Sequence, residues 1–324
     1  MMHQFKRRLA CLVCALALLA ASLPTAFAAP SAPAEPAAQT LSASDVKAMQ
    51  QADDAVAALT GSADFEQMSP AQRSTAALEQ LDQLIRQGLV EKGSVYADDE
   101  NGMISFAYTC GALGGILVSD EDPEETVLSA LPDETLDAQL QLVAENKRVG
   151  TAVIYYAFDN TVNSSRYPYY SYMRSYWDSL GLQTRLDTDV TLSDLRKMGS
   201  YDLCILSTHG AYYTYQYGWL IKKTATRPLI LLTERSSFWN DLRYGFDLLS
   251  HRVVKVNGMY AATSDFFRSA YRGSGIVLSE TCEFYGKNGH VDTSIADGLL
   301  AAGAKAVAGY VNNVYAVYSR SMLW

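Results

Sequence analysis

The pattern of hydrophobic positions changes once along the chain, near residue 148. Before it, apolar residues recur at three- and four-residue spacing in two segments, which is typical of amphipathic helices. The second of these follows Ser69-Pro70, a favourable helix start, and ends before Gly88. Two short runs flank an acidic turn and predict a β-hairpin. The elements expected in this first half are helices at 42–59, 70–87 and 135–147 and hairpin strands at 94–97 and 104–108.

After residue 148, short apolar runs alternate with helical patterns, which predicts βαβ units and a mostly parallel sheet. The rhythm is interrupted over 211–262, where Asn257-Gly258 is typical of a type I′ hairpin turn. A sheet with helical connections of this kind defines an α/β fold. The expected strands are 149–158, 183–186, 202–207, 229–233, 252–256, 259–262, 275–279 and 305–311, and the expected helices are 167–180, one from Thr191, 264–271 and 294–302.

The first 28 residues have the build of a Sec-type signal peptide. Three consecutive basic residues precede an apolar run that is short for a membrane span, and Ala26-Phe27-Ala28 fits a cleavage site. An Ala- and Pro-rich tether at 29–40 follows. We therefore expect a secreted or extracytoplasmic protein with no membrane span, composed of a small α+β region at 41–147 and a larger domain at 148–324. The smaller region carries no chemical signature, and a pro-domain, a cap over the site and a binding module all fit it.

The net charge and the cysteine content exclude several classes of function. The formal net charge is −9, and loss of the three signal-peptide cations makes it −12, which argues against a nucleic-acid partner. After the signal peptide the chain contains only Cys110, Cys204 and Cys282. A disulfide scaffold needs a larger and usually even number of cysteines. The four histidines show no metal-binding spacing, and no phosphate-binding glycine loop is present. We expect no metal and no cofactor.

The side chains that could take part in catalysis follow the ends of two predicted strands. The strand at 202–207 leads into His209-Gly210, and the strand at 275–279 leads into Glu280-Thr281-Cys282. Ligands of open α/β sheets bind beyond the carboxyl ends of the strands, so these ends would form a Cys/His pair if the two strands are neighbours. A nearby imidazole lowers the pKa of a thiol nucleophile and later protonates a leaving amine. A glycine beside the histidine allows close approach of the backbone.

These paired motifs resemble those of the caspase/gingipain/clostripain clan of cysteine peptidases. Residues 294–310 are similar to the helix and strand that follow the catalytic cysteine in gingipain-like and CHAT-type members, and the resemblance covers about residues 149–318. It implies a caspase-like three-layer αβα sandwich with a mostly parallel central sheet. The resembling families continue with further helices, so the resemblance also implies that this chain is a fragment or a minimal version.

The resemblance assigns roles to individual residues. Cys282 would be the nucleophile and His209 the general acid/base, and the backbone N–H groups of Gly210 and Cys282 would form the oxyanion hole. Glu280 stands where the clan places a side chain that lines the pocket for the residue before the scissile bond. An acid there would favour Arg or Lys. Asp159, at the end of the first strand of the larger domain, is a second candidate for that pocket.

Each candidate also has a purely structural interpretation. Cys282 would then be a buried strand-end thiol and His209 a hydrogen-bonded turn residue, while Asp159 fits a turn better than a pocket wall. His290, in a Gly/Asn-rich loop, and His251 are expected to face solvent. The tyrosines at 212, 213, 215 and 217 fit a half-exposed strand or loop better than a substrate wall.

These observations lead to two hypotheses from different classes. The first is a secreted caspase-like cysteine endopeptidase that hydrolyses protein or peptide substrates after Arg or Lys, through a thioester on Cys282. The second is a non-catalytic caspase-fold protein that serves as a binding or scaffold protein at the cell surface.

Overall fold

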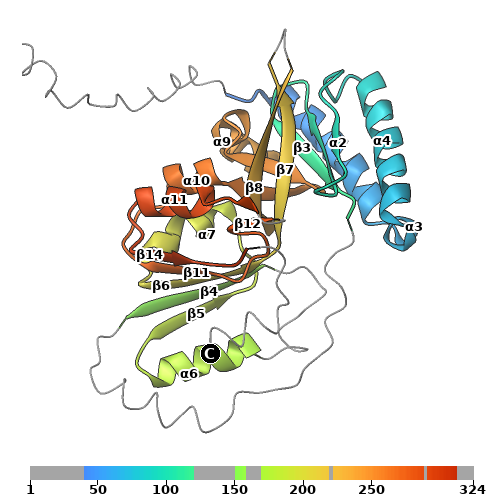
Figure 1. Ribbon diagram of the computed structural model, residues 1–324. Helices are drawn as coiled ribbons and strands as arrows, with labels where there is room; N and C mark the ends of the chain where they lie inside the picture. The colour runs from blue at the N-terminus through green and yellow to red at the C-terminus, as the bar shows by residue number, and fades with distance from the viewer. Residues whose placement is uncertain (1–39, 120–149, 158–168, 219–221, 288–289, 312–324) are drawn as a thin grey trace, which may run out of the picture. The chain divides into compact units, whose positions relative to one another are not determined.

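A five-stranded parallel sheet forms the centre of the larger half of the chain (Figure 1). The structure is a computed structural model, and it describes residues 40–119, 150–157, 169–218, 222–287 and 290–311. The strand order is β14-β11-β6-β4-β5, and every pair in it is parallel. The strands are β4 (Thr151–Ala157), β5 (Gln183–Asp187), β6 (Leu203–Thr208), β11 (Ile276–Ser279) and β14 (Ala306–Ala308).

Helices cover both faces of this sheet because the middle strands are apolar on both sides. On one face Ile154 and Ile205 pack against Tyr170 and Met173 of α6 (Tyr169–Ser179). On the other face lie α7 (Leu192–Lys197), α10 (Ser264–Ala270) and α11 (Ser294–Ala301), which bury residues against the alternate positions of the same strands (Figure 1). A short 3₁₀ turn, η1 (Met198–Ser200), leads from α7 towards β6.

A second, seven-stranded sheet combines strands from both halves of the chain. Its order is β1-β2-β3-β9-β10-β8-β7, and only the β3–β9 pair is parallel. The sheet curls until β1 and β2 pack against β7, and Tyr213 of β7 donates a hydrogen bond to the carbonyl of Gly114 of β3, 2.8 Å away. The strands are β1 (Tyr96–Asp98), β2 (Met103–Ala107), β3 (Leu113–Leu117), β7 (Gly210–Tyr217), β8 (Lys223–Arg235), β9 (Val253–Val256) and β10 (Met259–Thr263).

Three helices precede this sheet, and each begins at a serine that precedes its first turn. Ser42 and Ser69 form capping boxes with the third helical residue, and Pro70 occupies the first helical position after Ser69. Each buries one apolar face in the main core, and α2 also packs against α8. The helices are α2 (Ala43–Thr60), α3 (Ala63–Gln67) and α4 (Pro70–Arg86), and the remaining short elements are α8 (Phe238–Arg243), α9 (Gly245–Leu249), β12 (Gly286–Lys287) and β13 (His290–Val291).

A buried cation joins α2, α8 and the seven-stranded sheet. The Nζ atom of Lys255, on β9, lies 2.7 Å from the carboxylate of Asp53 and 2.8 Å from that of Asp241, and all three side chains are buried. Tyr108 donates to Asp53, and Tyr260 donates to Asp241 at 2.7 Å. Because buried charges require partners, this network fixes the N-terminal helix on the sheet.

Most of the predicted elements are confirmed. The helices α2, α4, α6, α7 and α11, both hairpins and the strands of the parallel sheet all lie where the hydrophobic pattern places them. The α/β class is therefore confirmed, although the seven-stranded sheet is mixed rather than parallel. In the described part of the chain, no helix combines the length and the apolar composition that a membrane crossing needs.

Some predictions are wrong in detail. The helix expected at 264–271 is α10, which ends one residue earlier, at Ala270. The strand at 305–311 is shorter than expected and is not buried, because β14 is an edge strand whose Ala306 and Ala308 are exposed. The predicted signal peptide at 1–28, the helix at 135–147 and nearly all of the tether lie outside the described residues and stay predictions, as does the role proposed for 41–147.

The buried network predicts a large effect of removing its cation. Lys255→Met leaves two buried carboxylates without their counter-charge, so we expect the free energy of unfolding to fall by about 3–5 kcal/mol. Urea denaturation measures this value. The matched control is Lys47→Met on the exposed side of α2, which should change stability by less than about 0.5 kcal/mol. Equal effects of the two substitutions would contradict the structural role of Lys255.

Candidate functional site

The two strands that carry the candidate motifs are neighbours. β6 and β11 pair in parallel, with Leu206 opposite Ser279. The backbone N–H of Glu280 then donates to the carbonyl of Leu206 at 2.7 Å, so the ladder continues one residue past the end of β11. Both strands therefore end at the same edge of the parallel sheet, where their next residues come together.

His209 is the single residue between two strands of different sheets. β6 ends at Thr208 in the parallel sheet, and β7 begins at Gly210 in the seven-stranded sheet. The carbonyl of His209 accepts a hydrogen bond from the N–H of Leu231 at 3.0 Å, and the hydroxyl of Thr208 donates to the carbonyl of Leu231. These two bonds to β8 hold the backbone on both sides of the imidazole.

Gly210 brings the backbone of β7 against that of Cys282. His209 and Leu231 form a hydrogen-bonded antiparallel pair, so the following pair, Gly210 and Ile230, is a non-hydrogen-bonded one. The N–H of Gly210 therefore faces away from β8. A Cβ atom on Gly210 would lie 2.0 Å from the carbonyl oxygen of Cys282. Only glycine fits this approach, which brings the two chain segments into backbone contact.

A strained turn follows Cys282. Glu283 has φ of 57°, a left-handed conformation that is uncommon for residues other than glycine. Its buried carboxylate lies 3.1 Å from Nζ of Lys287, and this ion pair holds the turn closed. The turn directs the chain into the short β12–β13 pairing, whose Lys287 lines the same cavity as Cys282. Backbone strain of this kind is frequent at functional sites.

The three thiols of the described chain differ in their surroundings. Cys204 lies within β6, is buried, and has a pKa raised far above the usual value by desolvation. Burial also raises the pKa of Cys110, which packs against the main core. Cys282 is half-buried and lines a cavity. Cys110 is half-buried as well, so Cys282 is distinguished by its place in the wall of a cavity, where a substrate can reach it.

The first cavity contains the candidate Cys/His pair. It has a volume of about 590 Å³, and its wall includes His209, Gly210 and Cys282. Acidic side chains outnumber basic ones along the rest of the wall, so the cavity is suited to a positively charged ligand. The charged residues are Glu66, Asp99, Glu100, Glu283, Arg235 and Lys287.

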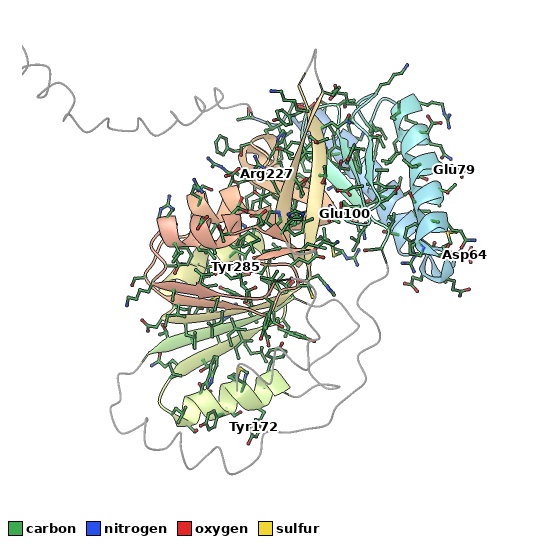
Figure 2. The ribbon with its side chains drawn as sticks, viewed as in Figure 1. Asp64, Glu79, Glu100, Tyr172, Arg227 and Tyr285 are labelled. Atoms are coloured by element: carbon green, nitrogen blue, oxygen red, sulfur yellow. The ribbon has the colours of Figure 1, made fainter. Side chains whose placement is uncertain are left out.

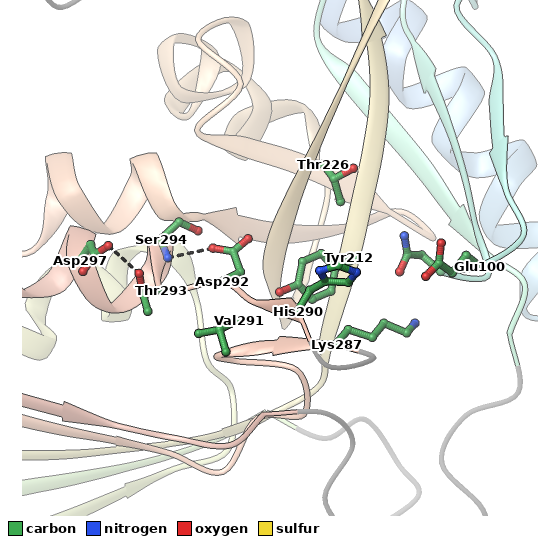
Figure 3. Close-up of a pocket in the computed structure, with 11 residues that line it drawn as sticks. Glu100, Tyr212, Thr226, Lys287, His290, Val291, Asp292, Thr293, Ser294 and Asp297 are labelled. Atoms are coloured by element: carbon green, nitrogen blue, oxygen red, sulfur yellow. Dashed lines mark hydrogen bonds between the residues drawn. The ribbon is translucent and has the colours of Figure 1, made fainter. Parts of the chain in front are cut away.

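A second cavity adjoins the first. Its volume is about 620 Å³, and it shares Glu100, Asn101 and Lys287 with the first cavity. Glu100 and Asn101 come from the turn between β1 and β2, so the N-terminal region contributes to both cavities (Figure 2). The other wall combines β7, β8 and the segment from β13 to α11, including Tyr212, Thr226, His290, Asp292, Thr293, Ser294 and Asp297 (Figure 3).

Glu280 is buried in a hydrogen-bonded cluster. Its carboxylate accepts from the hydroxyl of Tyr170 at 2.5 Å, and that hydroxyl lies 2.5 Å from the hydroxyl of Ser207. Tyr170 is on α6, so the Glu280 side chain faces the α6 side of the sheet. It does not line either cavity among the residues that the structure describes. Asp159 lies outside the described residues.

The remaining histidines and tyrosines have distinct positions. His290 is exposed, as predicted, whereas His251 is half-buried in a left-handed turn, 3.0 Å from the carbonyl of Gly111. Burial lowers the pKa of His251. Tyr213 and Tyr215 point into the curled sheet, while Tyr212 faces the second cavity. Within the described ranges, no group of three or more His, Cys, Asp or Glu side chains is arranged to hold a metal ion.

The sequence matches no protein-family model and no curated protein. The case for a function therefore depends on the geometry of this site.

The Cys/His pair at the strand ends is predictable from the sequence, whereas the walls of the cavities are not. His209, Gly210 and Cys282 follow apolar strands, which is a local signal. Glu100, Tyr212 and Asp292 are brought together from three distant segments. Asp292 also resembles an ordinary residue at a helix start, since it accepts a hydrogen bond from the N–H of Ser294. No local signal distinguishes such residues.

The close approach at Gly210 predicts a specific effect of a methyl group. Gly210→Ala places a Cβ atom against the Cys282 carbonyl and forces the two segments apart, so we expect a loss of about 1–3 kcal/mol in the free energy of unfolding. The rate of Cys282 alkylation by iodoacetamide should change as well. Gly245→Ala is the matched control, because its Cβ atom would meet nothing nearer than 3.4 Å. Wild-type stability and alkylation in Gly210→Ala would contradict the observed contact.

Proposed function

We propose that this protein is a caspase-like cysteine peptidase, with Cys282 as the nucleophile and His209 as the general acid/base. The parallel pairing of β6 and β11 is the observation that carries the proposal, because both residues line one cavity at the carboxyl ends of the strands. The accessibility of Cys282, in contrast to buried Cys204, adds support. The helices on both faces of the parallel sheet agree with the sandwich that this assignment requires.

The proposed reaction follows from the two side chains. The Cys282 thiolate attacks the carbonyl carbon of the scissile peptide, and a C–S bond forms as the carbonyl oxygen becomes an anion. The His209 imidazolium then gives its proton to the amide nitrogen, the C–N bond breaks, and the amine leaves. In the second half, His209 accepts a proton from water, which attacks the thioester. The carboxylic acid leaves and the thiolate is restored.

The oxyanion would be stabilised by backbone N–H groups. The N–H of Gly210, which faces away from β8, and the N–H of Cys282 are the two donors in this proposal. Donors fixed by a β-ladder need no reorganisation when charge develops, which is the basis of oxyanion stabilisation. The hydrogen bonds that flank His209 supply that rigidity.

The charge of the first cavity favours a basic side chain next to the scissile bond. Four acidic and two basic side chains line it, so Arg or Lys is favoured over an acid. Glu280 lines neither cavity and faces α6, so in this proposal its carboxylate acts only by adding negative charge behind the strand end, two residues before the cysteine. Protein or peptide substrates are therefore expected.

Selective labelling tests the dyad. An Arg- or Lys-directed acyloxymethyl ketone should modify Cys282 alone, as read by peptide mass spectrometry, while Cys110 and Cys204 stay unmodified. His209→Ala should slow this labelling by about tenfold or more, because the thiol loses the group that lowers its pKa. Turnover of a peptide substrate should fall by roughly 10²- to 10⁴-fold.

The matched control is His251→Asn, since asparagine tolerates the left-handed backbone at that turn. It should label as the wild type does. If Cys282 reacts with a generic thiol reagent but not with the Arg- or Lys-directed probe, the proposed peptidase activity stands and the preference for a basic residue is rejected. Absence of selective labelling by either reagent would favour a binding or scaffold protein instead.

The role proposed for Glu280 has its own test. Glu280→Gln keeps the shape of the side chain and removes its charge. We expect kcat/KM for a substrate with Arg before the scissile bond to fall by roughly tenfold, while the same peptide with neutral citrulline is hydrolysed at an unchanged rate. Glu79→Gln, on the exposed side of α4, controls for net charge. An unchanged preference for Arg in Glu280→Gln would assign the preference to other carboxylates.

A further inference from the structure

Two hydroxyl groups at the second cavity have no hydrogen-bond partner within the described part of the chain. They are Oη of Tyr212 and Oγ of Ser294, and both atoms are buried. Tyr212 as a whole is only 7% exposed, and it lies in the cavity wall with its hydroxyl on the Asp292 side (Figure 3). Buried polar groups are nearly always satisfied, so these two indicate a ligand that the cavity is built to hold.

Carboxylates make up much of the remaining wall of this cavity. Asp292 and Asp297, at the start of α11, and Glu100, from the turn between β1 and β2, line the same cavity. One oxygen of Asp292 accepts from the N–H of Ser294 at 2.9 Å, and one oxygen of Asp297 accepts from Thr293 at 2.7 Å. Each of these hydrogen bonds orients one carboxylate through one of its two oxygens.

The surroundings of the Tyr212 hydroxyl show that it faces acidic groups. Its pKa is raised well above the usual value by burial and then by the carboxylates of Asp292 and Glu283. The hydroxyl is therefore protonated at neutral pH, and its oxygen can accept a hydrogen bond from a ligand. Lys287 is the only Lys or Arg side chain of the described wall, which also includes His290, and it is already paired with Glu283.

A ligand with several N–H donors and a positive charge satisfies this wall. Carboxylates and hydroxyl oxygens are acceptors, and a guanidinium presents five donors in a planar fork. A metal ion fits less well, because the described side chains include no group of three or more suitable ligands. The chemistry of the cavity therefore matches an Arg or Lys side chain.

We propose that the second cavity is a subsite for a second basic side chain of the peptide substrate, held by Asp292, Asp297 and Glu100. The inference rests on the proposed function in treating the ligand as a peptide. Gly210 of the first cavity and Tyr212 of the second lie two residues apart on one face of β7, about 7 Å along the strand. An extended peptide covers that distance in two residues, so the second basic side chain lies about two positions from the first.

Binding to the full chain with Cys282→Ala tests the subsite without chemistry. Fluorescent peptides carry one Arg at a fixed place and a second Arg one to five positions away on either side, and matched peptides carry citrulline in the second place. Fluorescence anisotropy should show about tenfold tighter binding for the Arg peptide than for its citrulline match, greatest at a spacing near two. Asp292→Asn/Asp297→Asn should abolish this difference.

The matched control is Asp54→Asn/Glu79→Asn, which removes the same charge from exposed helix positions. It should keep the preference. Tyr212→Phe/Ser294→Ala is the second test, because neither hydroxyl has a partner whose loss would destabilise the protein. Its thermal unfolding should match that of the wild type while the preference for the second Arg falls at least threefold.

Equal binding of Arg and citrulline peptides, or a preference that survives in Asp292→Asn/Asp297→Asn, would overturn the subsite. The same would follow if none of the peptides bound. The proposed peptidase activity is judged separately, by Cys282 labelling and turnover in the protein with its thiol. A chain that hydrolyses peptides without preference for a second Arg retains the function and loses the subsite. A chain that binds the peptides selectively and hydrolyses none retains the subsite alone.

Discussion

The buried charge of Lys255 is the constraint on which the rest of the structure depends. A lysine inside the protein is tolerated only with its partners in place, and here the partners come from α2 and α8, far apart in sequence. Once α2 is held, the β1–β3 strands complete the seven-stranded sheet, and the turn that carries Glu100 and Asn101 reaches both cavities. The N-terminal region is thus structurally inseparable from the site that it helps to line.

The Cys/His pair depends on a second constraint, the contact of two chain segments at backbone distance. Gly210 permits the approach, the β7–β8 ladder fixes its direction, and the left-handed turn at Glu283 carries the chain away behind the cysteine. The strained turn at Glu283 and the close packing at Gly210 are compensated by the regular hydrogen bonds of the β6–β11 and β7–β8 ladders. This arrangement suits chemistry that requires fixed donors and an accessible thiol.

The sequence predicts what is encoded locally. Capped amphipathic helices and doubly buried strands such as β4 and β6 were identified because their patterns need no distant partner. β3 was missed because Gly114-Gly115 is unusual in a strand. For β7 the sequence left a strand and a loop both open, because its tyrosines alternate between a core and a cavity. The parallel pairing of β3 with β9 and the acidic wall of the second cavity come from long-range contacts, which no local pattern records. Strand ends are local, so His209 and Cys282 could be found, whereas Asp292 and Tyr212 could not.

The position of His209 between the two sheets has a mechanical consequence. β6 and β7 belong to different sheets, and His209 is the single residue that joins them. Any rotation of one sheet against the other turns the peptide planes on both sides of that residue and swings the imidazole with them. Cys282 follows β11 of the parallel sheet and contacts Gly210 of the other sheet, so such a rotation would change the alignment of the pair while leaving each sheet intact. An effector that separates the two sheets would need no contact with either residue to change how they are aligned.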